Sequence, residues 1–309
     1  MKATILGCGY VGRAVAIAWE AQGITVTATT THPERLAELE AIASHAVVMH
    51  GNDAPALASL LSDQDIVLIS VGAPQRTVEA YEETYLHTAK TLVASLPHTS
   101  VQQVIYTGTC AVYGEHEGAW VNEKTAIAPR SRTSEILAAT ERVLLSAAST
   151  QGNSGIQNSE TTDSATRDAA TRASETNGSE TNGSETNVCV LRLGGIYGPG
   201  RDLGRIFSRA AGKERPGDGS EPSNWVHLDD IMRAILFAAH YRLNGIFNLV
   251  QDHPPSRRDL IDWVCRANQL APVQWNPDLP GERSYNAKVS NQKIRQTGYV
   301  FVHPAFSLE

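Results

Sequence analysis

The sequence lacks the features that mark membrane-spanning and nucleic-acid-binding proteins. Its apolar runs all fall short of the roughly 18 to 20 residues that span a bilayer, and it has no run of five or more Lys or Arg. With 26 Lys and Arg against 33 Asp and Glu, the formal net charge is -7, which gives no positive surface for gripping a phosphate backbone. We therefore expect no membrane span, no signal peptide and no nucleic-acid partner.

Cysteine and metal-binding patterns are also scarce. The four cysteines lie far apart in apolar stretches without a C-x-x-C pair: Cys8, Cys110, Cys189 and Cys265. This spacing favours buried, reduced thiols in a cytoplasmic protein. The zinc-protease pattern H-E-x-x-H is absent because His116-Glu117 has no second His, and the serine-nucleophile pattern G-x-S-x-G is absent too. The sequence predicts neither a metal site nor a serine nucleophile.

One long segment is almost free of apolar side chains. Residues 149–187 consist mainly of Ser, Thr, Asn, Glu, Gly and Ala, with Ile156 as the one large aliphatic residue, and end in repeats of Ser-Glu-Thr-Asn-Gly. Such a composition cannot bury enough apolar surface to offset the entropy lost on ordering. We expect a disordered, low-complexity surface insertion.

Elsewhere, short apolar runs alternate with longer helix-like stretches. The expected strands are Ala3–Leu6, Ile24–Ala28, Ala46–Met49, Ile66–Ser70, Val101–Thr107 and Val188–Leu193. The expected helices are Tyr10–Gln22, Pro33–Ala43, Arg76–Leu96, Arg132–Ala148 and Asp229–His240. This rhythm predicts an α/β fold with a doubly wound parallel sheet covered by helices on both faces. After Gly194 the pattern loosens into loops rich in Gly and Pro, where we expect a smaller lobe.

A glycine-rich loop is the strongest functional signal. Gly7-Cys8-Gly9-Tyr10-Val11-Gly12 is a G-x-G-x-x-G motif between the first expected strand and the first expected helix, the context of a dinucleotide site. Gly7 would make the tight turn, Gly9 would let a pyrophosphate approach the backbone, and Gly12 would let helix and strand pack closely. The anion would bind at the helix N-terminus, beside Tyr10 and Val11. A structural turn without a ligand is the alternative.

The second expected strand bears on the choice of dinucleotide. An NAD site usually has an acid about 20 residues after the glycine loop to bind the ribose, but the stretch from Thr27 to His32 contains none. Thr30, His32 and Arg35 suit a 2'-phosphate better, so the sequence favours NADP over NAD. Asp53 could bind the adenine amine, or it could cap a helix that begins next to Pro55.

Five segments together resemble the extended short-chain dehydrogenase/reductases, which include NAD-dependent epimerases and dehydratases acting on nucleotide sugars. They are Gly7–Gly12, Ser70–Ala73, Thr107–Gly114, Tyr197–Gly200 and His227–Asp230. The resemblance covers essentially the whole chain except the insertion. It implies a Rossmann domain of residues 1–148 and 188–196, with residues 227–250 packing back, and a small substrate lobe of residues 197–226 and 251–309.

The same resemblance implies roles for individual residues. Val71, Gly72 and Thr107 would line the cofactor site, and Gly194 with Ile196 would lie near the nicotinamide. Thr109 matches the catalytic Ser or Thr of the family. Arg201 and Arg205 stand where the sugar-nucleotide enzymes meet their substrate, although a solvated helix face is an equally plain interpretation. The helices 76–96 and 132–148 correspond to those through which the resembling enzymes form homodimers.

The resemblance fails at the family's catalytic base, a Tyr followed four residues later by Lys. These positions hold Thr133 and Leu137, and none of the nine tyrosines has Lys at the fourth residue on. Ionising a free tyrosine near pH 7 without a neighbouring cation costs about 4 kcal/mol, so a conventional Tyr-Lys mechanism is not expected. The chain resembles the atypical members that lack the pair.

Three interpretations remain. In the first, the protein is an NADP-dependent oxidoreductase or epimerase in which Thr109 orients a substrate hydroxyl or carbonyl and Tyr113 or His227 moves the proton. Packing below the cofactor is the alternative for Tyr113, and capping of the lobe connection is the alternative for His227. In the second, the fold binds a dinucleotide without catalysis and acts as a redox sensor or partner-binding protein. The third, a UDP-glucose dehydrogenase type, lacks the Cys and Lys motifs that its chemistry needs.

Overall fold

The computed structural model describes residues 1–148, 186–279 and 285–306. The expected insertion, residues 149–187, lies outside this described part except for its last two residues. These two belong to the fold, because Thr186 is buried and donates its hydroxyl to Val101 O at 2.9 Å, and Asn187 begins a strand. The predicted insertion was therefore two residues too long at its C-terminal end.

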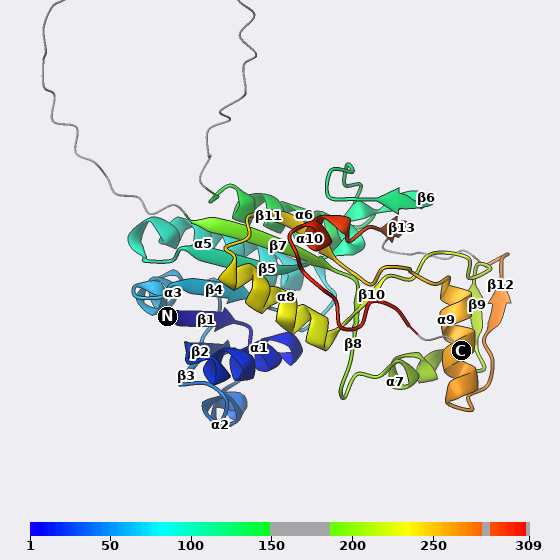
Figure 1. The fold of residues 1–309 in the computed structure, drawn as a ribbon, viewed down its shortest axis with the longest axis horizontal. Coiled ribbons are helices and arrows are strands. Elements are labelled where there is room, and N and C mark those ends of the chain that lie inside the picture. The colour runs from blue at the N-terminus through cyan, green and yellow to red at the C-terminus, as the bar shows by residue number, and fades with distance from the viewer. Residues whose placement is uncertain (149–185, 280–284, 307–309) are drawn as a thin grey trace, which may run out of the picture.

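Seven parallel strands form the central sheet, in the spatial order β11-β7-β5-β4-β1-β2-β3 (Figure 1). Their bounds are β1 Lys2–Leu6, β2 Thr25–Thr30, β3 His45–Val48, β4 Ile66–Ile69, β5 Gln103–Thr109, β7 Asn187–Leu193 and β11 Gly245–Leu249. The order reverses between β1 and β4, because the chain runs outward through β2 and β3 and then returns to pair β4 with β1. In open α/β sheets, ligands bind beyond the carboxyl ends of the strands at such a switch point.

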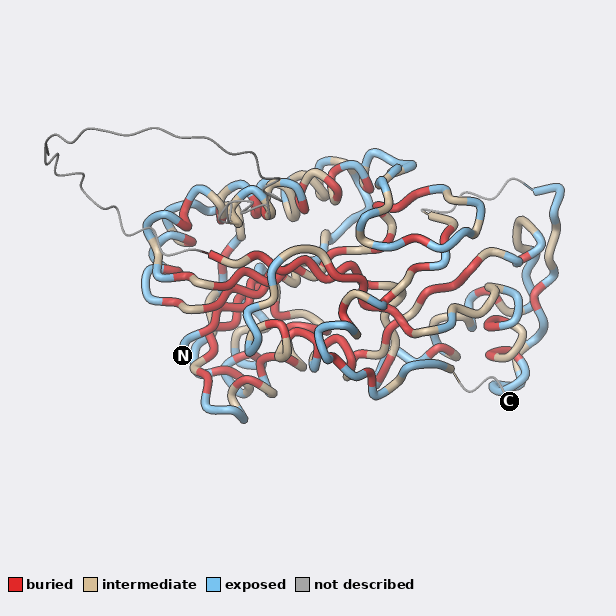
Figure 2. The backbone as a smooth tube through the Cα atoms, turned by 45° about the horizontal axis from the view of Figure 1, so that its top comes forward, coloured by how far each residue is buried: buried red, intermediate tan, exposed pale blue. Residues whose placement is uncertain are grey.

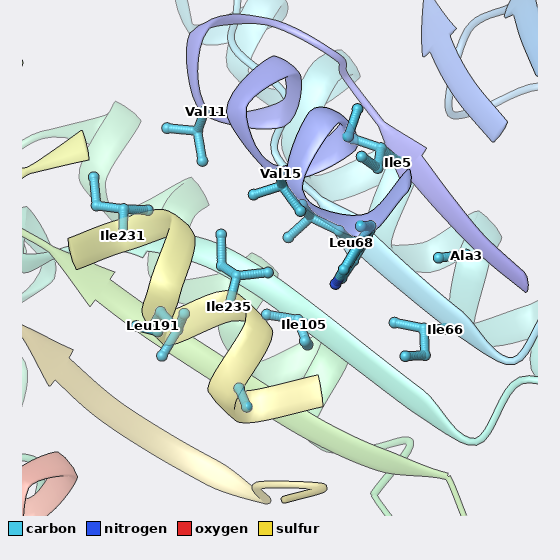
Figure 3. Close-up of a cluster of buried hydrophobic side chains, with 14 of the residues drawn as sticks. Ala3, Ile5, Val11, Val15, Ile66, Leu68, Ile105, Leu191, Ile231 and Ile235 are labelled. Carbon is cyan, nitrogen blue, oxygen red and sulfur yellow. The ribbon is translucent and has the colours of Figure 1, made fainter. Parts of the chain in front are cut away.

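The strands are buried on both faces, which explains their nearly continuous apolar sequences. Successive residues of β4 alternate between two buried clusters: Ile66 and Leu68 pack with α1 and α8, whereas Val67 and Ile69 pack on the opposite face. Figure 2 shows the strands as the most buried part of the chain, and Figure 3 shows Val15 of α1 and Ile235 of α8 over the first of these faces. Burial of each such side chain stabilises the fold by about 1.5–3 kcal/mol. The predicted doubly wound sheet is confirmed.

Helices cover both faces. Their bounds are α1 Tyr10–Ala21, α2 Leu36–Glu40, α3 Ala54–Leu61, α4 Val78–Tyr81, α5 Thr88–Ser95, α6 Arg132–Leu145 and α8 Leu228–His240. Ser131 begins α6 by accepting a hydrogen bond from the backbone N–H of Ser134 at 3.2 Å, as an N-terminal cap does. In the described part of the chain, no helix is both long enough and apolar enough to cross a membrane.

Two expected helices are divided. The stretch expected as Pro33–Ala43 begins with a 3-10 turn at Pro33–Arg35 and continues as the short α2. The stretch expected as Arg76–Leu96 consists of α4, a π-helical turn η2 at Glu82–His87 and α5. A π turn widens the helix by one residue per turn and is frequent at functional sites.

The smaller lobe contains short elements at one end of the sheet (Figure 1). These are β8 Gly195–Tyr197 paired with β10 Trp225–His227, β9 Glu214–Pro216 paired with β12 Gln274–Asn276, and the helices α7 Leu203–Phe207 and α9 Arg257–Ala267. A further pair, β6 Glu115–Val121 with β13 Asn286–Val289, is followed by α10 Gln292–Gln296. Three residues that the sequence assigns to this lobe, Ile294, Tyr299 and Phe301, pack in the same buried cluster as α1 and α8.

Candidate functional site

The glycine loop joins β1 to α1 at the switch point of the sheet. Gly7 has φ +84°, and a Cβ there would lie 2.7 Å from Val71 Cα, so only glycine fits. A Cβ on Gly12 would lie 2.8 Å from Gly7 O, whereas a Cβ on Gly9 would meet nothing within 4 Å. The first and third glycines thus serve the turn and the helix packing, and the second faces open space where a ligand can approach the backbone.

The N-terminus of α1 is free to receive an anion. Its N-cap is Gly9, no side chain caps it, and its first turn holds no acidic residue. The first N–H groups of a helix have no partner within the helix and carry the positive end of its dipole. The loop itself is held by β2, because Gly7 N donates to Thr29 Oγ1 at 3.1 Å and Cys8 N donates to Thr29 O at 2.9 Å.

The neighbouring strand ends bring the other expected cofactor residues to the same edge. Val71 contacts the glycine loop, and a Cβ on Gly72 would meet nothing within 4 Å. The Thr107 hydroxyl donates a hydrogen bond to Ile69 O at 3.2 Å, which joins β5 to β4. At the other side of this edge, Gly194 packs closely against Asn224, whose backbone carbonyl oxygen would lie 2.7 Å from an added Cβ. Ile196 pairs with Val226.

Basic side chains gather where β2 ends. Arg35 donates from Nη2 to Cys8 O at 3.0 Å, so its guanidinium lies against the glycine loop. Arg13 of α1 pairs with Glu38, which Arg35 also contacts. Burial raises the pKa of the Cys8 thiol to about 11, against the opposing effect of the positive charges of Arg35 and Arg13. Arg13 was not among the residues predicted from sequence, although its position directly after the third glycine was a signal.

The remaining residues expected near the ribose and adenine differ in their surroundings. Thr30 is buried, and its hydroxyl oxygen accepts a hydrogen bond from His32 N at 3.1 Å. The His32 side chain is exposed and lies 3.2 Å from Glu34. Asp53 caps α3, because its Oδ1 accepts a hydrogen bond from Ala56 N at 3.1 Å. Capping, one of the two interpretations of Asp53, is thus what the structure contains.

Thr109 ends β5 at the same edge of the sheet. Its side-chain oxygen accepts a hydrogen bond from Ala111 N at 3.1 Å and so caps the 3-10 turn η4, Cys110–Tyr113. The residue is half-buried. Since a hydroxyl both donates and accepts, its hydrogen is available to a ligand oxygen while its oxygen caps the turn.

Tyr113 is held by partners inside the protein. It is fully buried, its hydroxyl donates to Asn248 Oδ1 at 2.7 Å, and the Arg192 guanidinium lies 4.9 Å from its ring centroid. Burial raises the pKa of Tyr113 to about 12. A buried phenol with a fixed partner does not reach a ligand, so the geometry favours packing over the expected proton transfer.

A buried ion pair lies beneath this region. Glu141 of α6 accepts three hydrogen bonds from Arg192 of β7, at 2.7, 3.0 and 3.2 Å, and their side chains are only 4% and 3% exposed. Gly108 makes room for the pair, because a Cβ there would lie 3.1 Å from Glu141 Oε1. The pair fixes α6 to the sheet, and Arg192 was not among the residues predicted from sequence.

The loop after β8 carries the expected substrate residues. Tyr10 donates its hydroxyl to Pro199 O at 3.0 Å, and the Arg201 guanidinium lies 5.8 Å from the Tyr10 ring centroid. Arg201 is therefore brought to the N-terminus of α1. Arg205 donates to Gly200 O at 3.4 Å and is exposed on α7, as the solvated-face interpretation describes.

His227 caps α8. Its Nδ1 accepts a hydrogen bond from Asp229 N at 3.2 Å, and its ring lies 3.8 Å from that of His303, centroid to centroid. With Asp229, the two histidines bring three potential metal-ligand atoms within 4.8 Å of one another. The two rings are tilted by 40° to each other, and the lone pair of His227 Nδ1 accepts the capping hydrogen bond, so that nitrogen is not available to an ion. Burial and the neighbouring His303 lower the pKa of His227, and capping, the alternative given above, matches this geometry.

Comparison with known proteins identifies the family. Residues 3–249 match the NAD dependent epimerase/dehydratase family. Protein YeeZ of Escherichia coli K12 is 28% identical over 284 residues, covering 90% of this chain and 88% of YeeZ. A functionally unknown conserved protein from Silicibacter pomeroyi DSS has a similar structure, with a TM-score of 0.68, 21% identity and coverage of 98% of this chain and 94% of that chain.

A second similar structure is that of MoeE5 in complex with UDP-glucuronic acid and NAD. Its TM-score is 0.72 at 18% identity, and the match covers 96% of this chain and 91% of that chain. At these identities the two solved structures show the shared fold. The family match extends over most of the chain, from β1 to β11, and so includes the glycine loop, Thr109 and the switch point. The chain belongs to the NAD-dependent epimerase/dehydratase family.

Proposed function

We propose that the protein is an NADP-dependent oxidoreductase or epimerase that acts on a carbonyl or hydroxyl group, with a sugar nucleotide as the favoured substrate. The observation that carries this proposal is the uncapped N-terminus of α1, with Gly9 open, at the point where the strand order reverses. A pyrophosphate fits this cradle because it needs backbone N–H groups and a residue without a side chain. When bound, the nicotinamide would supply or accept a hydride.

The charges at the end of β2 favour NADP over NAD. Arg35 and Arg13 lie beside the glycine loop, where they share Glu38 as their present partner. A 2'-phosphate would replace that carboxylate as the acceptor, and guanidinium groups bind phosphate oxygens in a bidentate manner. β2 itself ends in Thr29 and Thr30, which offer hydroxyls where an NAD site usually has a carboxylate.

The substrate end is argued from Arg201 and Thr109. Arg201 reaches the N-terminus of α1 over Tyr10, where its charge suits a diphosphate group. The similar structure of MoeE5 contains UDP-glucuronic acid and NAD, which supports a sugar nucleotide as the substrate class. Thr109 would orient the reacting oxygen through its free hydroxyl hydrogen. We expect a cytoplasmic protein, since its four buried cysteines are free, and a homodimer through the α4–α5 and α6 side.

The first experiment is a titration with NADPH and NADH, followed by fluorescence and melting temperature. Ligand at 100 times its dissociation constant stabilises a fold by about 2.7 kcal/mol. The matched variant is Gly9→Ala, because its added Cβ meets no atom of the protein within 4 Å but occupies the path of the pyrophosphate. We expect an unchanged melting temperature without ligand and at least tenfold weaker NADPH binding. Equal NADPH binding by Gly9→Ala and the wild type would contradict the assignment of the cradle.

A second function, dinucleotide binding without catalysis, is favoured by the residues at the position of the missing base. Thr133 and Leu137 of α6 cannot ionise near pH 7, and the Tyr113 hydroxyl is held by Asn248. A redox sensor or partner-binding protein would bind NADPH and leave it unoxidised in a screen of carbonyl compounds and UDP-sugars. Oxidation of NADPH that depends on one of these compounds would exclude the second function.

A further inference from the structure

A tyrosine on an element next to α6 lies where it could take the place of the catalytic tyrosine that α6 lacks. Three tyrosine hydroxyls in the described part of the chain donate to fixed partners: that of Tyr10 to Pro199, that of Tyr113 to Asn248 and that of Tyr299 to Asp230. Tyr106 is buried in the core, and Tyr241 is exposed at the end of α8. A further tyrosine, Tyr85, lies on the helical segment beside α6.

Tyr85 lies on the π turn η2 and reaches the ligand edge of the sheet. Its hydroxyl oxygen accepts a hydrogen bond from Ala73 N at 3.3 Å. Ala73 follows directly after Gly72 in the loop beyond β4, the same loop whose Val71 contacts the glycine loop. Since β5 is the next strand in the sheet, the hydroxyl of Tyr85 lies at the edge where Thr109 ends β5.

The surroundings of Tyr85 tie it to α6, where the family's tyrosine would stand. The segment α4–η2–α5 packs along α6, and an ion pair of 3.7 Å joins Glu82 of η2 to Arg132 at the start of α6. The ring of Tyr81 lies 5.2 Å from that of Tyr85 and supports it from the preceding turn. Tyr85 is half-buried, and its hydroxyl oxygen is held by Ala73 N.

We propose that Tyr85 replaces the missing tyrosine of α6 and donates its phenolic proton to the carbonyl oxygen of the bound substrate. This inference rests on the proposed function. The Tyr85 O–H bond breaks as the substrate O–H bond forms and the C=O π bond opens; the nicotinamide, when bound, would supply the hydride that the carbonyl carbon gains. Water then returns a proton to the phenolate.

The hydrogen bond from Ala73 suits this role. Because the oxygen of Tyr85 already accepts a backbone N–H, its own hydrogen is left for the substrate, and the same N–H stabilises the phenolate once the proton has left. Burial raises the pKa of Tyr85, so the group stays protonated near neutral pH. It therefore acts as an acid in carbonyl reduction and needs no lysine to hold it ionised.

The test labels the tyrosines with 3-fluorotyrosine and follows their fluorine resonances during titration with NADP⁺ and then UDP-glucose. Tyr85→Phe and Tyr241→Phe assign the two resonances of interest. We expect the Tyr85 resonance to move when NADP⁺ binds, whereas that of the exposed Tyr241 stays in place. A Tyr85 resonance that stays in place while NADP⁺ raises the melting temperature would overturn the inference and leave the proposed function standing. Absence of any melting shift would overturn both.

Turnover gives a second readout once the carbonyl screen yields a substrate. Tyr85→Phe should lower kcat at least a hundredfold, the usual contribution of a positioned acid, with NADPH affinity changed less than threefold. Tyr81→Phe is the matched control, because it keeps the ring contact and removes a hydroxyl of the same helix. Equal kcat values for Tyr85→Phe and Tyr81→Phe would refute the proton-donor role.

Discussion

The buried pair of Glu141 and Arg192 makes a sharp prediction about stability. Replacing Arg192 by Met keeps most of the side-chain volume but leaves Glu141, only 4% exposed, without the donor of its three hydrogen bonds. Breaking a buried pair in this way costs about 3–5 kcal/mol, because an uncompensated charge remains in the core. With an unfolding entropy of about 2.1 cal/mol/K per residue, that corresponds to a drop in melting temperature of roughly 5–9 °C. Urea unfolding with an unchanged m-value measures the free energy directly.

The pH dependence of this loss identifies the cause. The guanidinium of Arg192 lowers the pKa of Glu141 against the effect of burial, so its removal raises the folded-state pKa further. A group whose folded pKa lies above its unfolded value takes up protons on folding, and its stabilising contribution is lost as pH rises through the folded pKa. The loss of unfolding free energy in Arg192→Met should therefore be greatest near pH 8 and become smaller as pH falls toward 5.

The matched control is the double variant Arg192→Met with Glu141→Gln, which removes both charges. It should recover more than half of the loss, since a neutral amide is far cheaper to bury than an unpaired carboxylate. A loss below 1 kcal/mol in Arg192→Met, or a double variant as unstable as the single one, would refute the reasoning about the pair.

Three further predictions concern the site. Arg35→Ala should weaken NADPH binding about tenfold to a hundredfold, the value of a charge-assisted hydrogen bond, and leave NADH binding unchanged. Parallel titrations check this, with Arg142→Ala, an exposed residue on a helix, as the control. An equal loss of affinity for both dinucleotides would argue against a 2'-phosphate contact. Asp53→Ala should cost about 1 kcal/mol of stability through loss of the α3 cap, with NADPH affinity intact; weaker NADPH binding would instead support the adenine contact. Burial and His303 lower the pKa of His227, so the unfolded chain binds more protons at this residue and stability should fall as pH drops from 7 to 5.5. His227→Gln should reduce this dependence of stability on pH, measured by urea unfolding. An unaltered pH dependence would mean that another group causes it.

The parts of the fold that sequence predicted well depend on local pattern. Each expected strand of the sheet lies within two residues of its observed bounds at either end, because an apolar run bounded by turns has few other ways to bury itself. The glycine loop was predictable for a similar reason: the tight turn at Gly7 and the packing at Gly12 impose the residue type directly. These are constraints that a single stretch of chain carries by itself.

The features that sequence did not predict depend on contacts between distant segments. The π turn that divides the expected helix 76–96 places Tyr85 against Ala73, and no sequence pattern around either residue predicts this contact. Tyr113 was a candidate for moving the proton, with packing as the alternative, but its direction is decided by Asn248, 135 residues away. Arg192 finds Glu141 across 51 residues. Tertiary partners settle the direction of a side chain, which residue spacing leaves open.

The glycine loop is held by hydrogen bonds within the protein, and this bears on how the enzyme and the inactive binder differ. Thr29 holds the backbone N–H groups of Gly7 and Cys8, and Arg35 holds the carbonyl of Cys8. Little ordering free energy remains to be lost on binding, so a catalyst and a sensor would use the same loop with similar affinity. Selection for catalysis would instead act where a proton must move, at Thr109 and Tyr85. A variant at these positions that keeps NADPH affinity but loses turnover therefore separates the two functions, which no change in the glycine loop can do.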